Sequence, residues 1–222
     1  MAGSTQPRAL PTPAIVPLGD SAIVVRFETS LTDAANKAAI AFAAALDSAG
    51  ITGVLEVAPS LVSVLLRYDP ITSSYAAIAG ELRLLLSGPQ VELPPPANWT
   101  IPVAFTGPDL DEVAALLGKS SDSFIEAHNA SPLRALATGF APGFVYLGLH
   151  PQELVVPRRQ TVRTAVPAGS VLFAAGQTAI TATEMPTGWH VIGHTDFSNF
   201  DPLRDPPTRL SAGDAVSFSV KP

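Results

Sequence analysis

The stretch GFAPGFVYLGLHPQELVVPRRQTVRTAVPAGSVLFAAGQTAITATEMPTGW, from Gly139 to Trp189, decides how this chain is interpreted. It begins with a glycine- and proline-rich loop and goes on through an arginine pair, a Gln-Thr pair and a Gly-Trp turn. Polar and aromatic residues alternate with glycines and prolines, a composition typical of a binding site built from loops on a rigid β-scaffold. The stretch therefore predicts a site carried on β-structure, for which the flanking sequence supplies the scaffold.

The sequence around this stretch predicts a β-barrel. From Leu133 to the end, short apolar runs alternate with turn signals, and no strong helical period is present. Many short strands of this kind indicate a closed or nearly closed barrel. Two short helices are expected before it, one capped at Asp109 and ending at Leu117, the other running from Ser121 to Asn129.

The first half of the chain predicts an α+β domain. The expected order is strand, helix, strand, strand, helix, strand, over residues 21–27, 30–50, 51–57, 61–68, 69–88 and 99–105. This is the order of the ferredoxin-like split βαβ arrangement. We therefore expect a flexible N-terminal tail over residues 1–14, a ferredoxin-like domain over 15–105, and a barrel domain with short helices at its start over 106–222.

Composition excludes several classes of function. A net charge of −6 on 222 residues argues against a general nucleic-acid binder, which needs a basic surface to neutralise phosphates. The absence of cysteine excludes disulfides, thiolate catalysis and cysteine-ligated metal sites. No apolar run is long enough to cross a bilayer. We expect a soluble, cytoplasmic protein without a nucleic-acid or membrane partner; only 14% of its residues are charged, which suggests that apolar surface meets a partner chain.

The loop formed by Gly139, Phe140, Ala141, Pro142, Gly143 and Phe144 is the sharpest local feature. Glycine permits positive φ and close backbone approach, and the proline fixes the bend. One interpretation is a loop that lines a ligand site with exposed backbone N–H groups. The other is a tight turn whose two phenylalanines plug the barrel.

The adjacent arginines Arg158 and Arg159 form a candidate anion site. A guanidinium binds a carboxylate or phosphate in a bidentate manner. Because adjacent residues on a strand face opposite ways, at most one of the two is expected to point into a given site. Two solvated surface charges are the alternative.

His194 is the candidate acid–base group. On a strand, His190, His194 and Asp196 would share one face, but nothing marks a further ligand, so no metal site is predicted. A hydrogen-bonding or proton-transferring role near neutral pH is possible for His194, and so is a structural role. Gln177-Thr178 could present polar groups to a ligand or satisfy backbone groups at a barrel corner.

Familiar nucleotide and hydrolase motifs are missing. The sequence has no Walker A loop, no Rossmann glycine fingerprint and no Gly-X-Ser-X-Gly elbow. An ATP or nicotinamide enzyme that works alone by a familiar route is therefore not supported.

The motifs GFAPGFVYLG, PRR, VPAGSV, GQT, GW, IGHT and FDP, followed by GD near the C-terminus, resemble the 5-oxoprolinase B-subunit family. This family also includes the Kip-type sporulation-kinase inhibitor (KipI) and the so-called allophanate hydrolase subunit 1. The resemblance covers nearly the whole chain and is densest from Gly139 to Phe218. It implies a small N-terminal α+β domain and a C-terminal cyclophilin-like β-barrel.

The resemblance also implies an enzyme of several chains. The expected partner is the larger homologous subunit, of the 5-oxoprolinase C-subunit or allophanate hydrolase subunit 2 type, and in many bacteria a third subunit. Together they open the lactam of 5-oxoproline to glutamate with ATP, which the assembled complex is expected to bind. Arg158 or Arg159 would offset phosphoryl charge and His194 would move the proton. The substrate, a small molecule, would be held by Gly139, Phe140, Pro142, Gly143, Phe144, Gln177, Thr178 and Trp189.

The chain departs from the family pattern beside the expected pocket. Ala179, Ile180 and Thr181 replace a usual Gly-aliphatic-Tyr run, Thr187 replaces a common glycine, and His150 stands where an apolar residue is common. These departures bear on the substrate more than on the fold. Two other functions implied by the resemblance stay open: a module that inhibits a histidine kinase, and half of a biotin-dependent carboxyltransferase acting on a urea-like substrate.

Overall fold

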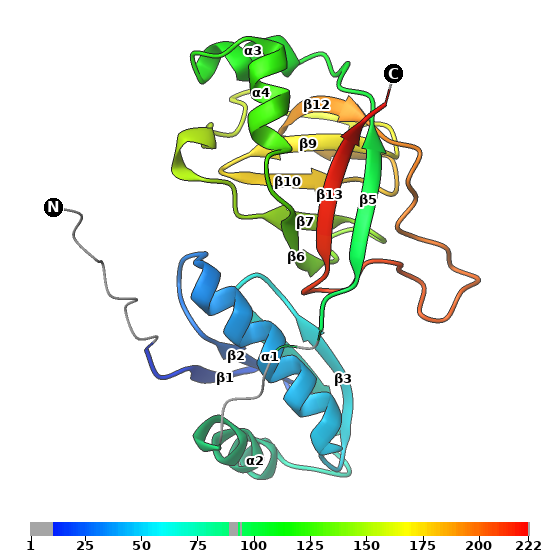
Figure 1. Ribbon diagram of the computed structural model, residues 1–222. Coiled ribbons are helices and arrows are strands. Elements are labelled where there is room, and N and C mark those ends of the chain that lie inside the picture. Colours follow the sequence, from blue (N-terminus) through cyan, green and yellow to red (C-terminus); the bar gives the residue numbers. More distant parts are fainter. Residues whose placement is uncertain (1–10, 89–92, 94, 222) are drawn as a thin grey trace, which may run out of the picture. The chain divides into compact units, whose positions relative to one another are not determined.

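The computed structural model describes residues 11–88, 93 and 95–221 (Figure 1). The chain forms two compact units, Met1–Pro94 and Pro95–Pro222, each with its own sheet and core. The mixed α+β class predicted from the sequence is confirmed. Within the described residues, no helix combines the length and the apolar character that a membrane crossing requires.

The first unit is a four-stranded antiparallel sheet with two helices on one face. The strand order is β1-β2-β4-β3, and both helices pack their apolar stripes on the buried side chains of β2 and β4. The elements are β1 (Ala14–Leu18), β2 (Ala22–Arg26), α1 (Asp33–Ala49), β3 (Val54–Pro59), β4 (Ser63–Tyr68) and α2 (Tyr75–Ser87).

Local chemistry sets the ends of both helices. Thr32 caps α1 by accepting the N–H of Ala35, and Gly50 ends it in the left-handed conformation with φ 56°. Ser74 caps α2 in the same way. The predicted start of this helix at Asp69 is wrong, because the Asp69 carboxylate accepts the N–H of Ile71 and holds a turn there instead.

The ferredoxin-like arrangement is not confirmed. Strands β2 and β3 are parallel with β4 between them, as that arrangement requires, but the edge beside β2 is filled by β1, which precedes it. A tight turn with Gly19 at φ 63° folds β1 onto β2, so the edge is taken within the first hairpin. Residue 14, assigned to the tail, already belongs to this strand.

The strand predicted over 99–105 belongs to the second unit. Strand β5 (Asn98–Val103) pairs in parallel with β13, and the chain divides after Pro94 rather than after residue 105. The elements that follow are α3 (Leu110–Leu116), α4 (Ser121–His128), β6 (Leu133–Thr138), β7 (Val145–Gly148), the 3₁₀ turn Gln152–Leu154, β8 (Arg163–Val166), β9 (Ser170–Ala174), β10 (Gln177–Ile180), β11 (Met185–Thr187), β12 (His190–His194) and β13 (Ala215–Val220).

Seven strands of this unit form one curled sheet. Their order is β12-β9-β10-β7-β6-β13-β5, and β8 and β11 form a separate two-stranded ribbon. Just beyond β5, Ala104 exchanges both backbone hydrogen bonds, each 2.9 Å, with His194 of β12. The outermost strands therefore meet at one bridge, and the sheet curls into a nearly closed barrel as the strand pattern predicts. The specific likeness to a cyclophilin stays an expectation.

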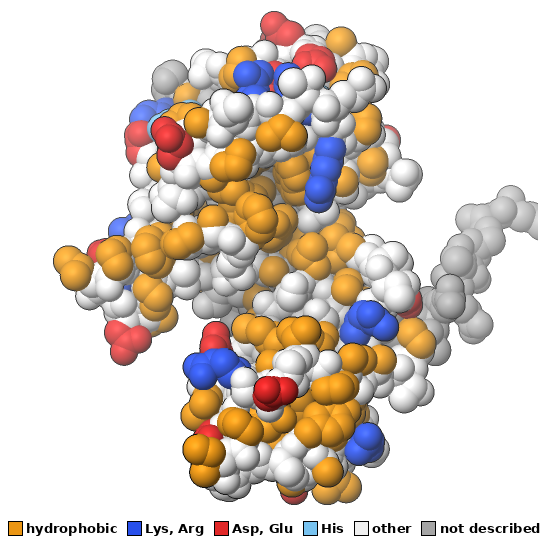
Figure 2. Space-filling model, turned by 180° about the vertical axis from the view of Figure 1, so that it is seen from behind, with side chains coloured by type: hydrophobic (Ala, Val, Ile, Leu, Met, Phe, Trp, Pro, Cys, Tyr) orange, Lys and Arg blue, Asp and Glu red, His pale blue; other side chains and the backbone are white. Residues whose placement is uncertain are grey.

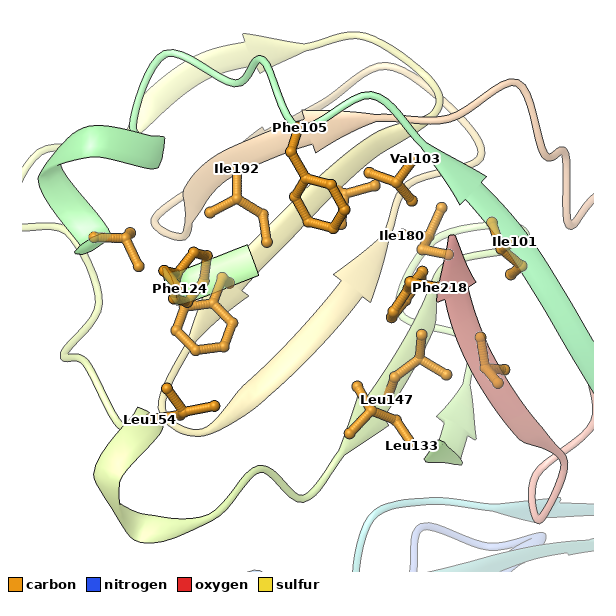
Figure 3. Packing of buried hydrophobic residues seen from close by; sticks show 14 of the residues in the cluster. Ile101, Val103, Phe105, Phe124, Leu133, Leu147, Leu154, Ile180, Ile192 and Phe218 are labelled. Carbon is orange, nitrogen blue, oxygen red and sulfur yellow. The ribbon is translucent and has the colours of Figure 1, made fainter. Parts of the chain in front are cut away.

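The main core lies between this sheet and the helices α3 and α4. The side chains of Phe105, Phe124 and Phe218 point into it together with aliphatic residues of the strands (Figure 3). Phe124 is fully buried and its ring meets that of Phe173 edge-on at 5.2 Å. Burial of one such side chain contributes roughly 1.5–3 kcal/mol to the stability of the unit.

The opposite face of the sheet carries a second, smaller apolar cluster. Along β9, Val171 and Phe173 belong to the main core, whereas Leu172 and Ala174 belong to the second cluster. This alternation follows from the two-residue period of a strand. Phe144 and Trp189, two of the predicted site residues, lie on this second face.

Candidate functional site

Four aromatic side chains form a continuous series of ring contacts on the second face of the barrel sheet. The ring of Phe140 meets Phe144 at 5.7 Å, Phe144 meets Tyr146 at 4.8 Å, and Tyr146 meets Trp189 at 6.0 Å, all in edge-on geometry. We call Phe140, Phe144, Tyr146 and Trp189 the aromatic face. Such edge-on pairs stabilise beyond the area they bury and hold the rings at fixed angles.

The sequence places these rings together for simple reasons. Phe144 and Tyr146 are two residues apart at the start of β7, so both point to the same side. Beneath them lie the smaller side chains of Leu172, Ala179 and Val191. Phe144 and Trp189 are buried in this cluster, Tyr146 is half-buried and Phe140 is exposed, so Tyr146 and Phe140 are the rings that offer surface to a ligand.

The loop before β7 is held in a strained conformation. Phe140 has φ 76°, an unusual value for a bulky residue, and Gly143 has φ 70°. The Gly139 N–H donates to the Phe144 carbonyl at 2.9 Å and closes the loop. A side chain at Gly143 would collide with Ala182 and Phe200, so close packing as well as φ requires glycine here.

Arg158 lies over one end of the aromatic face. Its guanidinium carbon is 5.8 Å from the centre of the Trp189 ring, and the side chain is exposed. Burial raises the pKa of the Tyr146 hydroxyl, and the positive charge of Arg158 opposes that rise. An exposed guanidinium beside rings is suited to an anionic group on a flat ligand.

Gln177 shares this side of the sheet. It pairs with Ala174 on β9 and alternates with Thr178, so its side chain lies on the face of the second cluster. The amide is buried, and its Oε1 has no hydrogen-bond partner among the described residues. An unpaired buried acceptor costs free energy that a ligand N–H would recover.

Arg159 turns away from the aromatic face into a buried ion-pair network. Its Nη1 lies 2.6 Å from Asp109 Oδ1 and 3.4 Å from Glu112 Oε2, while Arg163 binds the same Asp109 carboxylate. Asp109 also accepts the Val191 N–H at 2.8 Å. The predicted catalytic role of Arg159 therefore has no support in its placement, since its charge is already balanced within this chain.

This network holds Asp109 ionised. Burial alone would raise the pKa of its carboxyl, but the hydrogen bonds from Arg163 and Val191 and the charges of the two arginines outweigh burial and keep the pKa below its usual value. The network fastens α3 to the segment that carries Arg158.

His194 does not reach the aromatic face. It is exposed at the end of β12, and its Nε2 lies 3.2 Å from the Ala168 carbonyl oxygen. Three strand-to-strand steps separate β12 from β7, which places His194 about 14 Å along the sheet from Val145. The expected proton transfer by His194 at this face is therefore not supported by its position.

Thr178 points into the main core, opposite to Gln177. Its hydroxyl lies 2.7 Å from His128 Nε2 and 2.9 Å from His150 Nε2. Because Asn129 Oδ1 can only accept, the proton of His128 is on Nδ1. His128 Nε2 therefore accepts a hydrogen bond from the Thr178 hydroxyl. The oxygen of that hydroxyl in turn accepts a hydrogen bond from the Nε2–H of His150. Thr178 is thus part of a buried series of hydrogen bonds and is not available to a substrate.

Both histidines of this buried series are neutral. Burial lowers the pKa of His128 to about 4, although the hydrogen bond to Asn129 acts to raise it. Burial, together with the charge interaction with His128, lowers the pKa of His150 to about 3. Their rings are 4.7 Å apart. No group of three or more histidine, aspartate or glutamate side chains among the described residues is arranged to hold a metal ion.

The structure therefore divides the predicted site residues into two groups. Those on or beside the aromatic face are Phe140, Phe144, Trp189, Arg158 and Gln177, with Gly139, Pro142 and Gly143 supplying the loop. Those elsewhere are Arg159, Thr178 and His194. Two hollows, of about 940 Å³ between α1 and α2 and about 560 Å³ between α4 and β13, include no residue of the aromatic face.

Sequence reasoning missed Tyr146, Asp109, Arg163 and the buried histidine pair. Tyr146 could have been found, because it stands two residues after Phe144 on a strand. The partners of Asp109 could not, because Arg159 and Arg163 lie 50 and 54 residues further along the chain. The histidine pair joins a helix to a strand and a loop and has no local signature.

Comparison with known proteins identifies the family. The family model described as carboxyltransferase domain, subdomain C and D, matches residues 13–210. The 5-oxoprolinase B-subunit of Escherichia coli O157:H7 is 37% identical over 206 residues, covering 90% of this chain and 93% of that protein. The protein of the same name from Bacillus subtilis (strain 168) is 32% identical, covering 90% of each chain. The chain belongs to the 5-oxoprolinase B-subunit family.

A solved structure extends the comparison at the level of the fold. The urea carboxylase of Kluyveromyces lactis superposes with a TM-score of 0.74 over 95% of this chain at 15% identity. The chain spans 22% of that protein. At this identity the likeness shows a shared fold, so this member of the 5-oxoprolinase B-subunit family has a carboxyltransferase-like architecture.

Replacement of Asp109 by asparagine tests the ion-pair network. Asp109→Asn leaves two guanidinium groups facing a neutral amide, and we expect the free energy of unfolding to fall by about 3 kcal/mol. Urea denaturation followed by circular dichroism measures it. Asp196→Asn, at an exposed pair with Lys221, is the control and should change little. Equal effects of the two substitutions would contradict a structural role for the network.

The buried histidines predict a loss of stability in mild acid. Because their pKa values in the folded protein lie below the ordinary 6.5, their contribution is complete above pH 6.5 and is lost as pH falls towards 4. Near pH 5 the unfolded chain binds two more protons, so the free energy of unfolding should fall by roughly 2.7 kcal/mol per pH unit from these groups.

His150→Leu should halve this slope, because only one histidine of the pair then remains to titrate. Urea denaturation between pH 7 and 4.5 gives the slopes directly. A slope in His150→Leu equal to that of the unaltered protein would show that the pair does not titrate as described.

Proposed function

We propose that this chain is a non-autonomous subunit of an ATP-dependent 5-oxoprolinase, which opens the lactam of 5-oxo-L-proline to L-glutamate. The observation that carries the proposal is the match to 5-oxoprolinase B-subunits over nine-tenths of both chains. The aromatic face with Arg158 and Gln177 supports it, because these groups suit a small flat ring that bears a carboxylate and an amide.

The proposed contacts follow from the geometry of the face. The lactam ring lies against the half-buried ring of Tyr146, which Phe144 and Trp189 hold in place, and its carboxylate or a phosphoryl oxygen meets Arg158. The amide N–H meets Gln177 Oε1, the acceptor that lacks a partner among the described residues. These groups orient the substrate, which is the part of the reaction this chain can supply.

ATP is a second substrate of the proposed reaction. Transfer of its γ-phosphoryl group to the lactam oxygen releases ADP and activates the ring carbon towards water. Water adds to this carbon, phosphate leaves, and the ring C–N bond breaks, so that the water oxygen ends in the new carboxylate and the nitrogen takes up a proton to become the amine of glutamate. A single exposed arginine is not a nucleotide site. We therefore assign ATP binding and the acid–base group to the assembled complex, with the larger homologous subunit and a third subunit as partners.

A second candidate is half of a biotin-dependent carboxyltransferase acting on a urea-like substrate. The family model and the fold of urea carboxylase favour it. The same face would then hold a planar ureido group. Biotin dependence separates this reaction from lactam opening.

Reconstitution tests the proposal. The chain, the larger subunit and the third subunit are expressed together, and ATP-dependent release of glutamate from 5-oxoproline is followed. We expect activity that requires all three chains. Undiminished activity when this chain is left out would reject the proposal, and biotin-dependent carboxylation of urea in its place would select the second candidate.

Arg158→Ala tests the site within that complex. Loss of the cation facing a developing anion should lower kcat/KM about 10- to 100-fold and leave the stability of the chain within roughly 0.5 kcal/mol. Arg209→Ala is the matched control, because Arg209 also lies 5.8 Å over an aromatic ring, that of Phe197, away from the aromatic face. Equal activity of the two variants would remove Arg158 from the site.

A further inference from the structure

His190 is a buried polar residue at the start of β12, where the next two residues, Val191 and Ile192, are apolar. Only 2% of it is exposed. Its Nε2 lies 3.1 Å from the Pro157 carbonyl oxygen, and its Nδ1 has no partner among the described residues. A buried ring with an unpaired nitrogen lowers stability, so packing alone does not explain a histidine at this position.

The hydrogen bond of His190 holds one of two peptide groups that flank Arg158. Because a carbonyl oxygen can only accept, His190 Nε2 carries a proton and donates it to the Pro157 carbonyl. On the other side, the Arg159 N–H donates to the Gly188 carbonyl at 2.8 Å. A peptide group is planar, so these two bonds orient the planes on both sides of the Arg158 Cα and set its two backbone dihedrals.

Both anchors are the sequence neighbours of Trp189. Gly188 precedes it and His190 follows it, so the two bonds hold the backbone of Arg158 beside that of Trp189. The guanidinium carbon of Arg158 then lies 5.8 Å from the centre of the Trp189 ring. Of the two anchors, the one at Gly188 is a backbone group, whereas the one at His190 is a side chain that a substitution can remove.

The contact with the Trp189 ring is too weak to hold Arg158 by itself. Arginine is a long side chain with much rotamer freedom, and a cation–π contact at an exposed site contributes little. On the side of the second unit that is turned away from α4, apolar side chains gather and Lys and Arg side chains stand apart from one another (Figure 2). Where cations stand apart, the direction of each guanidinium sets where an anion can bind beside it.

We propose that His190 is a positioning residue, whose Nε2–H holds the peptide group before Arg158 and so keeps the guanidinium over Trp189. The consequence for catalysis rests on the proposed function, in which that guanidinium meets the carboxylate or a phosphoryl oxygen of the substrate. A charge that is held in place before the reaction stabilises a developing anion without further reorganisation.

NMR spectra of the full chain test the geometry without any reaction. A side chain over an indole ring has proton signals shifted upfield by the ring, so the Hδ and Hε signals of Arg158 report the contact. His190→Leu removes the donor and fills most of the same space, and the upfield shift should be lost. His190→Gln keeps an N–H donor close to the position of Nε2 and should keep the shift.

His194→Leu is the matched control. It removes the same kind of bond, from His194 Nε2 to the Ala168 carbonyl at 3.2 Å, at the other end of β12, and should leave the Arg158 signals unchanged. An upfield shift that survives in His190→Leu overturns the inference, even where Tm falls, because the role of His190 is then structural only. A wild-type chain without the shift also overturns it.

The proton of His190 gives a test that needs no variant. Nitrogen NMR spectra of the imidazole should show a proton on Nε2 that exchanges slowly with water, as a buried donor to a carbonyl requires. A proton found on Nδ1 alone would mean that the bond to Pro157 does not form, and the inference fails.

A double-mutant cycle in the assembled complex tests the consequence for catalysis. His190→Leu should lower kcat/KM for 5-oxoproline by up to about tenfold, and should have no further effect once Arg158 is replaced by alanine. Losses that add in the double variant overturn the inference, because His190 then acts by a route other than Arg158. A wild-type complex that opens no 5-oxoproline rejects the proposed function, and the NMR spectra then decide the positioning role by themselves.

Discussion

The alternation of side chains along the barrel strands decides what each residue of this protein can do. The curled sheet has two apolar faces, one packed against α3 and α4 and one covered by aromatic rings. Neighbours in sequence are therefore separated in role: Gln177 lies on the aromatic side, and Thr178 joins two histidines in the core. A shift of one residue in register would exchange these two sets, so the site depends on the pairing of β7, β10 and β9.

The same separation operates between the two arginines. Arg159 is fixed by Asp109, which is buried and bonded to α3, β12 and Arg163 at once. Because adjacent residues of an extended segment face opposite ways, fixing Arg159 leaves Arg158 to face Trp189. A buried ion pair contributes little net stability by itself, since the desolvation of its charges offsets their attraction. Here its consequence is positional, because it aims the neighbouring guanidinium at the aromatic face.

Local sequence patterns predicted some features of this protein and could not predict others. Strand periodicity, capping residues and turn glycines are local, and they gave the short helices, most strands and the loop that carries Phe140 and Gly143. Which strand fills a sheet edge is not a local property, because strands compete for the same edge. Strand Ala14–Leu18 takes the edge beside β2, and Asn98–Val103 pairs instead with Ala215–Val220 in the second unit. The same limit applies to His194, whose residue type suits proton transfer but whose strand ends far from the rings.

The exposure of Arg158 to water explains why a site beside it would gain from a second polypeptide. Two unit charges 4 Å apart attract by about 1 kcal/mol in water and by about 4 kcal/mol near a partly buried protein surface. Arg158 is exposed, so an anion beside it gains the smaller amount until another surface displaces the water. The difference of roughly 3 kcal/mol corresponds to more than a hundredfold in rate when the charge develops in the transition state.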